Sequence, residues 1–158
     1  MSPKARKIFL TLFYSGLSKK APGTVGSFVA LIMGMFLLQY FTVENLFLIS
    51  ILISILAVKQ INIYEKEVGT HDGSEIVIDE LAGMWITLSV AGVSYDNYIM
   101  GIIAFVYFRL FDIWKPSVVG KIDADVSGGW GVMGDDMVAG VLAGLSTALT
   151  YHLIAPFI

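Results

Sequence analysis

Four carboxylates stand close together near the middle of the chain, where the surrounding sequence is apolar. Asp72, Glu75, Asp79 and Glu80 lie within nine residues, and an uncharged run over residues 81–93 follows them. On a helix that turns about 100° per residue, the first three would share an arc of about 60°, and the fourth would widen it to about 140°. Two like charges about 4 Å apart repel by roughly 4 kcal/mol at an effective dielectric of 20. The cluster therefore requires something positive among its members.

Part of this cluster has a simpler explanation. Asp72 followed by Glu75 is the pattern of a capping box, in which both side chains satisfy the first N–H groups of a helix. Asp79 and Glu80 would lie a full turn or more inside such a helix, where capping does not account for them. We therefore predict that Asp79 and Glu80 are catalytic and bind a metal ion, with Asp72 as a further ligand. Gly83 on the same face would let another helix come close.

A second acidic pair, Asp135-Asp136, follows a glycine-rich segment over residues 128–134. The glycines are predicted to form a loop, either to bring backbone N–H groups to a ligand or only to let the chain turn. Asp135 could serve as an N-cap for the apolar run that follows, but a second adjacent acid is less needed there. Two acidic pairs, each where an apolar helix begins, favour Mg²⁺, which takes carboxylate oxygens and is completed by substrate phosphate. We predict both aspartates as metal ligands.

Two cationic side chains end the fourth apolar run, at Arg109 and Lys115, with Asp112 between them. Arg109 and Asp112 are three residues apart and could simply pair on one helix, while Lys115 could complement a helix C-terminus that Pro116 ends. Alternatively, both cations hold an anionic group and Asp112 joins the acidic cluster, because arginine offers a planar fork to phosphate and lysine a compact charge. Under this second interpretation Arg109, Asp112 and Lys115 are catalytic.

The composition indicates a membrane protein. Hydrophobic residues make up 56% of the 158 residues and charged residues 15%, with a mean hydropathy of +0.78, whereas a soluble domain carries about 25% charged residues. The net charge of −3 gives no support for a nucleic-acid partner, and none is expected. The chain has no cysteine, which excludes disulfides, thiolate nucleophiles and cysteine–zinc sites. A single domain is expected over residues 1–158.

Four or five apolar runs approach the length of a membrane span. They cover residues 25–41, 45–58, 81–93, 98–108 and 137–158. A full span needs about 20 residues, or about 17 at the low end, so only the first and last suffice by themselves. Ahead of them, residues 8–17 follow Lys4, Arg6 and Lys7 and are predicted to form a short helix on the membrane surface. Residues 21–27 are predicted as a turn from their Pro and Gly.

The distribution of charge predicts an orientation. With the N-terminus inside and each run crossing once, the inner segments 1–24, 59–80 and 112–136 hold nine of the ten Lys and Arg residues. The tenth, Arg109, lies less than one turn from the inner boundary, and the outer loops hold only Glu44 and Asp96 as charges. This is the positive-inside pattern, so the acidic clusters are expected at the cytoplasmic face.

Taken together, four stretches resemble the phosphatidylglycerophosphatase A family, membrane-bound Mg²⁺-dependent phosphatases of phosphatidylglycerol synthesis. They span positions 22 to 140 and match every acidic and basic position: Pro22-Gly23-Thr24…Gly26-Ser27, Asp72…Glu75-Ile76-Val77…Asp79-Glu80…Gly83, Phe108-Arg109…Phe111-Asp112…Lys115-Pro116 and Gly128-Gly129…Gly131-Val132-Met133…Asp135-Asp136…Ala139-Gly140. The resemblance implies removal of phosphate from phosphatidylglycerophosphate, an all-helical fold and a bacterial inner membrane. Thr24 and Ser27 are predicted to bind substrate with Arg109 and Lys115.

We therefore predict an all-α integral membrane helical bundle with about four or five membrane-embedded helices and an N-terminal interfacial helix. A cation transporter would place its carboxylates nearer the middle of the bilayer and away from Arg109 and Lys115. A structural membrane protein would not gather two acidic pairs and a glycine-rich segment on one side. An alcohol-transferring phospholipid synthase would need an Ala-Arg pair after Asp72-Gly73, which is absent. Direct attack by water and a phospho-aspartate intermediate both stay open, as do protein partners.

Overall fold

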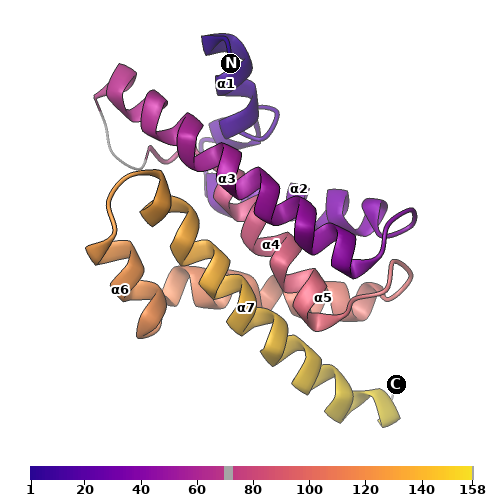
Figure 1. The fold of residues 1–158 in the computed structure, drawn as a ribbon. Helices are drawn as coiled ribbons and strands as arrows, with labels where there is room; N and C mark the ends of the chain where they lie inside the picture. Colours follow the sequence, from indigo (N-terminus) through magenta and orange to yellow (C-terminus); the bar gives the residue numbers. More distant parts are fainter. Residues whose placement is uncertain (70–72, 158) are drawn as a thin grey trace.

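The structure is a computed structural model that describes residues 1–69 and 73–157, and all regular secondary structure in these residues is helical. This confirms the all-α prediction for the described chain (Figure 1). The elements in order are α1 Pro3–Leu10, η1 Ser15–Leu17, α2 Pro22–Leu37, α3 Val43–Val68, α4 Ile78–Ala91, α5 Tyr98–Trp114, α6 Val118–Asp125, α7 Gly129–Ile154 and η2 Ala155–Phe157.

Helix α4 forms the centre of the bundle. From Ile78 to Leu88 every residue except Asp79 is buried, and α4 packs against α2, α3, α5 and α7. In Figure 1, α3 and α7 run diagonally across the front, and α4 lies between and behind them. A helix that is apolar on all sides is stable when neighbours cover every side, which explains why this run occupies the core.

Glycines allow α4 and α7 to approach closely. A Cβ atom on Gly140 would lie 2.5 Å from the Gly83 carbonyl oxygen, and one on Gly83 would lie 2.7 Å from the Asp136 carbonyl oxygen. Side chains at either position would force the two backbones apart. The predicted close approach at Gly83 is confirmed, and its partner is the part of α7 that carries Asp136.

The predicted acidic helix over residues 72–80 is wrong in its start, because α4 begins only at Ile78. The backbone just before it has a distant partner instead: the Val77 N–H donates to the Leu10 carbonyl oxygen at 2.9 Å. Asp79 and Glu80 therefore occupy the first turn of α4 rather than its interior. Both acids lie where exposed N–H groups and the helix dipole favour negative charge.

Glu75 is separated from the acidic cluster as a result. It lies before α4, where its Oε1 accepts a hydrogen bond of 2.7 Å from the Tyr64 hydroxyl of α3. The predicted capping box of Asp72 and Glu75 does not form at the start of α4, whose N-cap is Val77. Asp72, predicted as a metal ligand, lies outside the described residues.

Two segments predicted as a turn and a loop are helical instead. Helix α2 begins at Pro22, inside the predicted turn, because the fixed φ and missing N–H of proline suit a first helical position. Helix α7 begins at Gly129, inside the predicted glycine-rich loop, where Asn62 Oδ1 of α3 accepts a hydrogen bond of 2.7 Å from the Gly129 N–H. Asp135 lies six residues further along α7, so it is not the N-cap.

The N-terminal helix is present but shorter and earlier than predicted. Helix α1 ends at Leu10, and three consecutive residues with positive φ, Leu12 to Tyr14, separate it from η1. Arg6, one of the cations that precede the predicted surface helix, is buried and bonds Gln60 and Glu67 of α3. Helix α1 is therefore attached to the bundle through α3.

By length and composition, two of the described helical segments could cross a membrane: α3 with 26 residues and Gly129–Phe157 with 29. Helices α2, α4 and α5 have 16, 14 and 17 residues, which is about 24, 21 and 26 Å at 1.5 Å per residue. The hydrocarbon core of a bilayer is about 30 Å thick. The structure thus supplies two candidate spans and three shorter helices where four or five spans were expected.

Candidate active site

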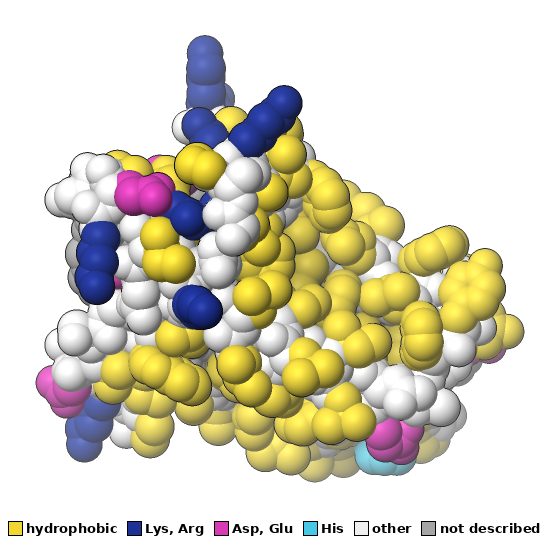
Figure 2. Space-filling model, turned by 45° about the horizontal axis from the view of Figure 1, so that its top comes forward, with side chains coloured by type: hydrophobic (Ala, Val, Ile, Leu, Met, Phe, Trp, Pro, Cys, Tyr) yellow, Lys and Arg dark blue, Asp and Glu magenta, His cyan; other side chains and the backbone are white. Residues whose placement is uncertain are grey.

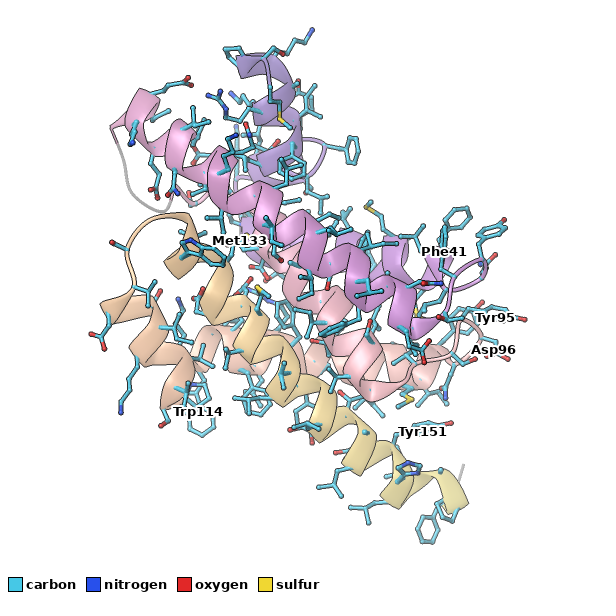
Figure 3. The ribbon with its side chains drawn as sticks, viewed as in Figure 1. Phe41, Tyr95, Asp96, Trp114, Met133 and Tyr151 are labelled. Atoms are coloured by element: carbon cyan, nitrogen blue, oxygen red, sulfur yellow. The ribbon has the colours of Figure 1, made fainter. Side chains whose placement is uncertain are left out.

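A pocket of about 340 Å³ opens at the end of the bundle where α4 and α7 begin and α5 ends. Its wall gathers six carboxylates and a lysine: Asp79, Glu80, Asp112, Asp123, Asp135, Asp136 and Lys115. Figure 3 shows Trp114 and Met133 toward this end of the molecule and Phe41, Tyr95 and Asp96 at the opposite end. The fold thus brings together chemical groups that are dispersed over residues 79–136 of the sequence.

Three carboxylates from three helices meet in this pocket. Glu80 of α4, Asp112 of α5 and Asp136 of α7 each offer one oxygen, and these oxygens lie within 4.8 Å of one another. Glu80 and Asp136 are 7% and 3% exposed. Although it is buried, Asp136 Oδ2 has no hydrogen-bond partner within the described chain. We call Glu80, Asp112 and Asp136 the acidic triad.

Arg109 of α5 pairs with two members of the acidic triad. Its Nη1 donates to both carboxylate oxygens of Glu80, at 2.7 and 2.6 Å, and lies 2.7 Å from Asp112 Oδ2. The predicted pair with Asp112 therefore forms, but it is part of a larger arrangement. With all three acids ionised, one guanidinium leaves a net charge of −2 on the group. Buried charge of this kind is stable when a cation compensates it, and a divalent ion has the matching charge.

Lys115 contacts a different pair of carboxylates at the pocket wall. It is the C-cap of α5, with a φ of 47°. Its Nζ donates to Asp135 Oδ2 at 2.8 Å and also bonds Asp123 of α6. Burial alone would lower its pKa, but the contacts with Asp123 and Asp135 outweigh that effect and raise the pKa of Lys115 above its usual value. Lys115 is therefore a permanent positive charge facing the pocket.

Each predicted acidic pair contributes one member to the acidic triad. Glu80 and Asp136 enter it, whereas Asp79 lines the pocket and accepts a hydrogen bond from the Glu80 N–H at 2.9 Å. Asp135 also lines the pocket and bonds Lys115, and its Oδ1 is buried without a partner among the described residues. The third member, Asp112, was predicted as a catalytic residue and not as a ligand.

The two α2 residues predicted to bind substrate do not form the pocket wall. Pro22 and Gly23 supply the α2 part of that wall. Thr24 is partly buried, and Ser27 is fully buried, with its Oγ 2.6 Å from Glu80 Oε2. Ser27 therefore contacts Glu80 of the acidic triad from the interior of the bundle, and not from the pocket.

Two contributors to the pocket were not among the predicted site residues. A Cβ atom on Gly23 would lie 2.3 Å from Glu80 Oε1, so glycine leaves the space that the carboxylate occupies. Asp123 lies on α6 and pairs with Lys115, the C-cap of α5. Helix α6 lies within the predicted inner segment 112–136, which has no apolar run to indicate it. Only the local excess of acids in that segment points to Asp123.

Comparisons with known proteins identify relatives over most of the chain. The family model of phosphatidylglycerophosphatase A matches residues 8–151. Phosphatidylglycerophosphatase A of Escherichia coli is 37% identical over 142 residues, which cover 89% of this chain and 80% of that protein. The protein of the same name from Haemophilus influenzae is 34% identical over 131 residues, covering 83% and 79%.

A third relative carries a different name. A provisionally named phosphatidylinositol-3-phosphatase of Bacteroides thetaiotaomicron is 36% identical over 148 residues, which cover 91% of this chain and 92% of that protein. No solved structure matches the chain. The family match contains the whole pocket, from Pro22 to Asp136. The chain therefore belongs to the phosphatidylglycerophosphatase A family, whose members hydrolyse phosphate monoesters.

Proposed function

We propose that this protein removes the phosphate monoester from phosphatidylglycerophosphate, giving phosphatidylglycerol and inorganic phosphate, in a reaction that depends on Mg²⁺. We further propose that it does so at the cytoplasmic face of a bacterial inner membrane. The observation that carries the proposal is the buried acidic triad beside Arg109 and Lys115, in a chain of this family.

The acidic triad has the chemistry of a Mg²⁺ site. Its donors are carboxylate oxygens, which hard divalent cations prefer. Buried acceptors normally have partners, so Asp136 Oδ2, which has none among the described residues, also favours a ligand at this point. In the proposal Glu80, Asp112 and Asp136 hold the ion, and Asp79 and Asp135 lie beside them. When bound, Mg²⁺ would polarise the phosphoryl group and activate water for attack.

Two cations would recognise the substrate phosphate. Lys115 lines the pocket, where its ammonium could bond a phosphoryl oxygen and offset its charge. Arg109 holds Glu80 and Asp112, and its Nε is buried with no hydrogen-bond partner among the described residues. To contact phosphate, Arg109 would use N–H groups other than those of Nη1, the atom that holds both carboxylates. Arginine suits this double role because its several N–H groups can serve both anions.

The molecular surface supports a membrane setting. Large apolar side chains are exposed at helical spacing on four helices: Phe28, Ile32 and Phe36 on α2, Leu48, Leu52 and Ile55 on α3, Ile99, Ile102 and Val106 on α5, and Leu145, Leu149 and Leu153 on α7. Figure 2 shows a broad hydrophobic area on one face, with Lys and Arg side chains gathered toward one side. Apolar patches of this extent are rare on soluble monomers and are typical of a surface that meets lipid.

Phosphate release by the purified protein in detergent micelles tests the proposal. We expect release from phosphatidylglycerophosphate with Mg²⁺, its loss in EDTA and its return when Mg²⁺ is added back. Phosphatidylinositol 3-phosphate belongs in the same assay, because the Bacteroides relative is named for that substrate. Full activity in EDTA would contradict the metal requirement, and faster release from the phosphoinositide would contradict the substrate assignment.

A further inference from the structure

Ser27 connects three helices immediately behind the acidic triad. It is 0% exposed on α2. Its Oγ lies 2.6 Å from Glu80 Oε2 on α4, 2.8 Å from the Gly23 carbonyl oxygen of its own helix, and 3.1 Å from Arg109 Nη1 on α5. Among the described residues, the Ser27 hydroxyl therefore contacts both an acid of the triad and the cation that pairs with it.

The hydroxyl has one proton for two acceptors. The Glu80 carboxyl oxygen is the closer acceptor and is paired with the Arg109 guanidinium, and hydrogen bonds within such charge-paired groups are the stronger ones. Donation to Glu80 leaves the oxygen lone pairs of Ser27 free to accept the N–H of Arg109. Ser27 therefore orients Glu80 and Arg109 at the same time.

Glycines bring α2 close enough for these contacts. A Cβ atom on Gly23 would lie 2.3 Å from Glu80 Oε1 and 3.3 Å from Arg109 Nη2. One on Gly26 would lie 2.7 Å from Val77 Cβ, at the N-cap of α4. The start of α4 therefore packs directly against the backbone of α2, and α2 presents the Ser27 hydroxyl to Glu80 as its polar group.

We infer that Ser27 is a positioning residue, which fixes the Glu80 carboxylate in the orientation that binds the divalent cation. It acts through Glu80 and does not contact substrate. The inference rests on the metal site of the proposed function. Second-layer hydrogen bonds of this kind typically change metal affinity by about 10- to 100-fold when removed.

A matched control exists on α3. Ser54 is 2% exposed, and among the described residues its Oγ bonds only the Ser50 carbonyl oxygen, at 2.8 Å, one turn earlier in the same helix. If the important bond of Ser27 were the one to the Gly23 carbonyl oxygen, the substitutions Ser27→Ala and Ser54→Ala would have the same effect. The substitutions Ser27→Ala and Ser54→Ala remove the same atom from equally buried positions, and they differ in the contacts with Glu80 and Arg109.

Binding of Mn²⁺, measured by electron paramagnetic resonance on the detergent-solubilised full chain, tests the inference without an activity readout. We expect Ser27→Ala to weaken Mn²⁺ binding by about 10- to 100-fold, Ser27→Cys to fall between it and the wild type, and Ser54→Ala to match the wild type. In the phosphatase assay, Ser27→Ala should require more Mg²⁺ for half-maximal rate. Its KM for phosphatidylglycerophosphate at saturating Mg²⁺ should not change.

Other outcomes would overturn the inference in separable ways. Wild-type affinity in Ser27→Ala would remove the positioning role and leave the metal site intact. A raised KM with unchanged Mn²⁺ affinity would make Ser27 a substrate contact. Absence of Mn²⁺ binding by the wild type would overturn the metal site together with this role. If circular dichroism shows that Ser27→Ala is unfolded, Mn²⁺ binding is measured on two other variants instead. These are Ser27→Cys and Gly23→Ala, in which the added methyl group crowds Glu80 Oε1.

Discussion

Asp136 is a residue of the acidic triad that we expect to oppose stability while supporting the proposed function. It is buried beside two other carboxylates, and one of its oxygens has no hydrogen-bond partner among the described residues. Asp136→Asn removes a like charge from this group. We expect at least about a hundredfold loss of activity, the order seen for catalytic groups and their supports. The melting temperature in EDTA should stay equal or rise, because buried like charges are destabilising.

The comparison with Asp96 makes this prediction specific. Asp96 is exposed at the opposite end of the molecule, where it bonds Ser94 (Figure 3). Asp96→Asn should leave both the rate and the Mg²⁺-dependent rise in melting temperature unchanged. If Asp136→Asn lowered the melting temperature in EDTA and Mg²⁺ still stabilised it, Asp136 would be a structural residue and not a ligand.

Arg109 permits a test of charge against geometry. Arg109→Lys keeps one positive charge but loses the planar group whose Nη1 serves Glu80, Asp112 and Ser27 together. We expect this variant to be substantially impaired in turnover. The double variant Arg109→Leu with Asp112→Leu should be inactive even where it folds, because Glu80 loses its cation and the triad loses a member. Near-normal turnover of the double variant, with membrane insertion verified, would reduce Arg109 to a local ion pair.

At the scale of single residues, the sequence predicted which acids gather in the pocket better than how they are arranged there. Acids inside apolar surroundings are conspicuous, so the pairs at 79–80 and 135–136 were found without a structure. Adjacent residues on a helix point about 100° apart, however, so both members of a pair cannot face the same point. The structure selects Glu80 and Asp136 for the triad and adds Asp112 from another helix. The burial of Ser27 depends on contacts between α2 and α4 that no local pattern contains.

At the scale of the helices, the contact between α4 and α7 determines where Asp136 lies. A Cβ atom on Gly140 would meet the Gly83 carbonyl oxygen at 2.5 Å, and backbone cannot move aside as a side chain can. Gly140→Ala should therefore destabilise the protein by about 1–3 kcal/mol, the range for overpacked interiors. It should also lower activity, because displacement of α7 moves Asp136 away from Glu80.

Gly101 is the matched control for this prediction. It is a buried glycine of α5, and the nearest atom to an added Cβ is the flexible Met35 Sδ, at 3.3 Å. Gly101→Ala should be neutral or slightly stabilising, since alanine favours a helix by about 1 kcal/mol over glycine. Urea titrations in detergent, together with phosphate release, measure both variants. Equal stability of the Gly140→Ala and Gly101→Ala proteins would contradict the importance of the α4–α7 contact.

The helices themselves were predictable where a long apolar run defined them, and their starts were not. Helix α4 begins only after Val77, because the Val77 N–H donates to the carbonyl oxygen of Leu10, which is far away in the sequence. The glycine-rich segment becomes helical because Asn62 of α3 accepts the Gly129 N–H. In both places a distant partner decides the local structure, and the usual preferences of glycine and of capping residues are overridden.

For the whole molecule, the charge distribution predicts the orientation in the membrane. The loop between α4 and α5 carries Asp96 and no Lys or Arg, whereas the pocket end carries Lys115 and Lys121. Because the chain lacks cysteine, single cysteines can be introduced on a clean background. We expect Tyr95→Cys to react with an impermeant thiol reagent added from outside, and Ser127→Cys to stay unlabelled until the membrane is opened. Both positions are exposed, so the reverse pattern would overturn the orientation.

The number of membrane spans could not be obtained from hydropathy, because burial in protein and burial in lipid select the same residue types. The run over residues 81–93 is apolar because α4 is covered by its neighbours in the bundle core. The run over residues 45–58 belongs to a longer helix, α3, whose exposed side carries Leu48, Leu52 and Ile55. The exposed fraction of each side chain distinguishes burial in protein from burial in lipid, and that fraction can be obtained only from the folded structure.

The bond between Leu10 and Val77 has a practical consequence for handling the protein. The segment after α1 supports the start of α4: besides this bond, Gly16 lies so close to the Glu75 carbonyl oxygen that an added Cβ would be 2.1 Å away. Proteolytic trimming or a bulky fusion before Gly16 would therefore act on the pocket end of the bundle, although these residues look peripheral in the sequence. An affinity tag is better attached beyond Phe157, since α7 carries the C-terminus away from the pocket (Figure 1).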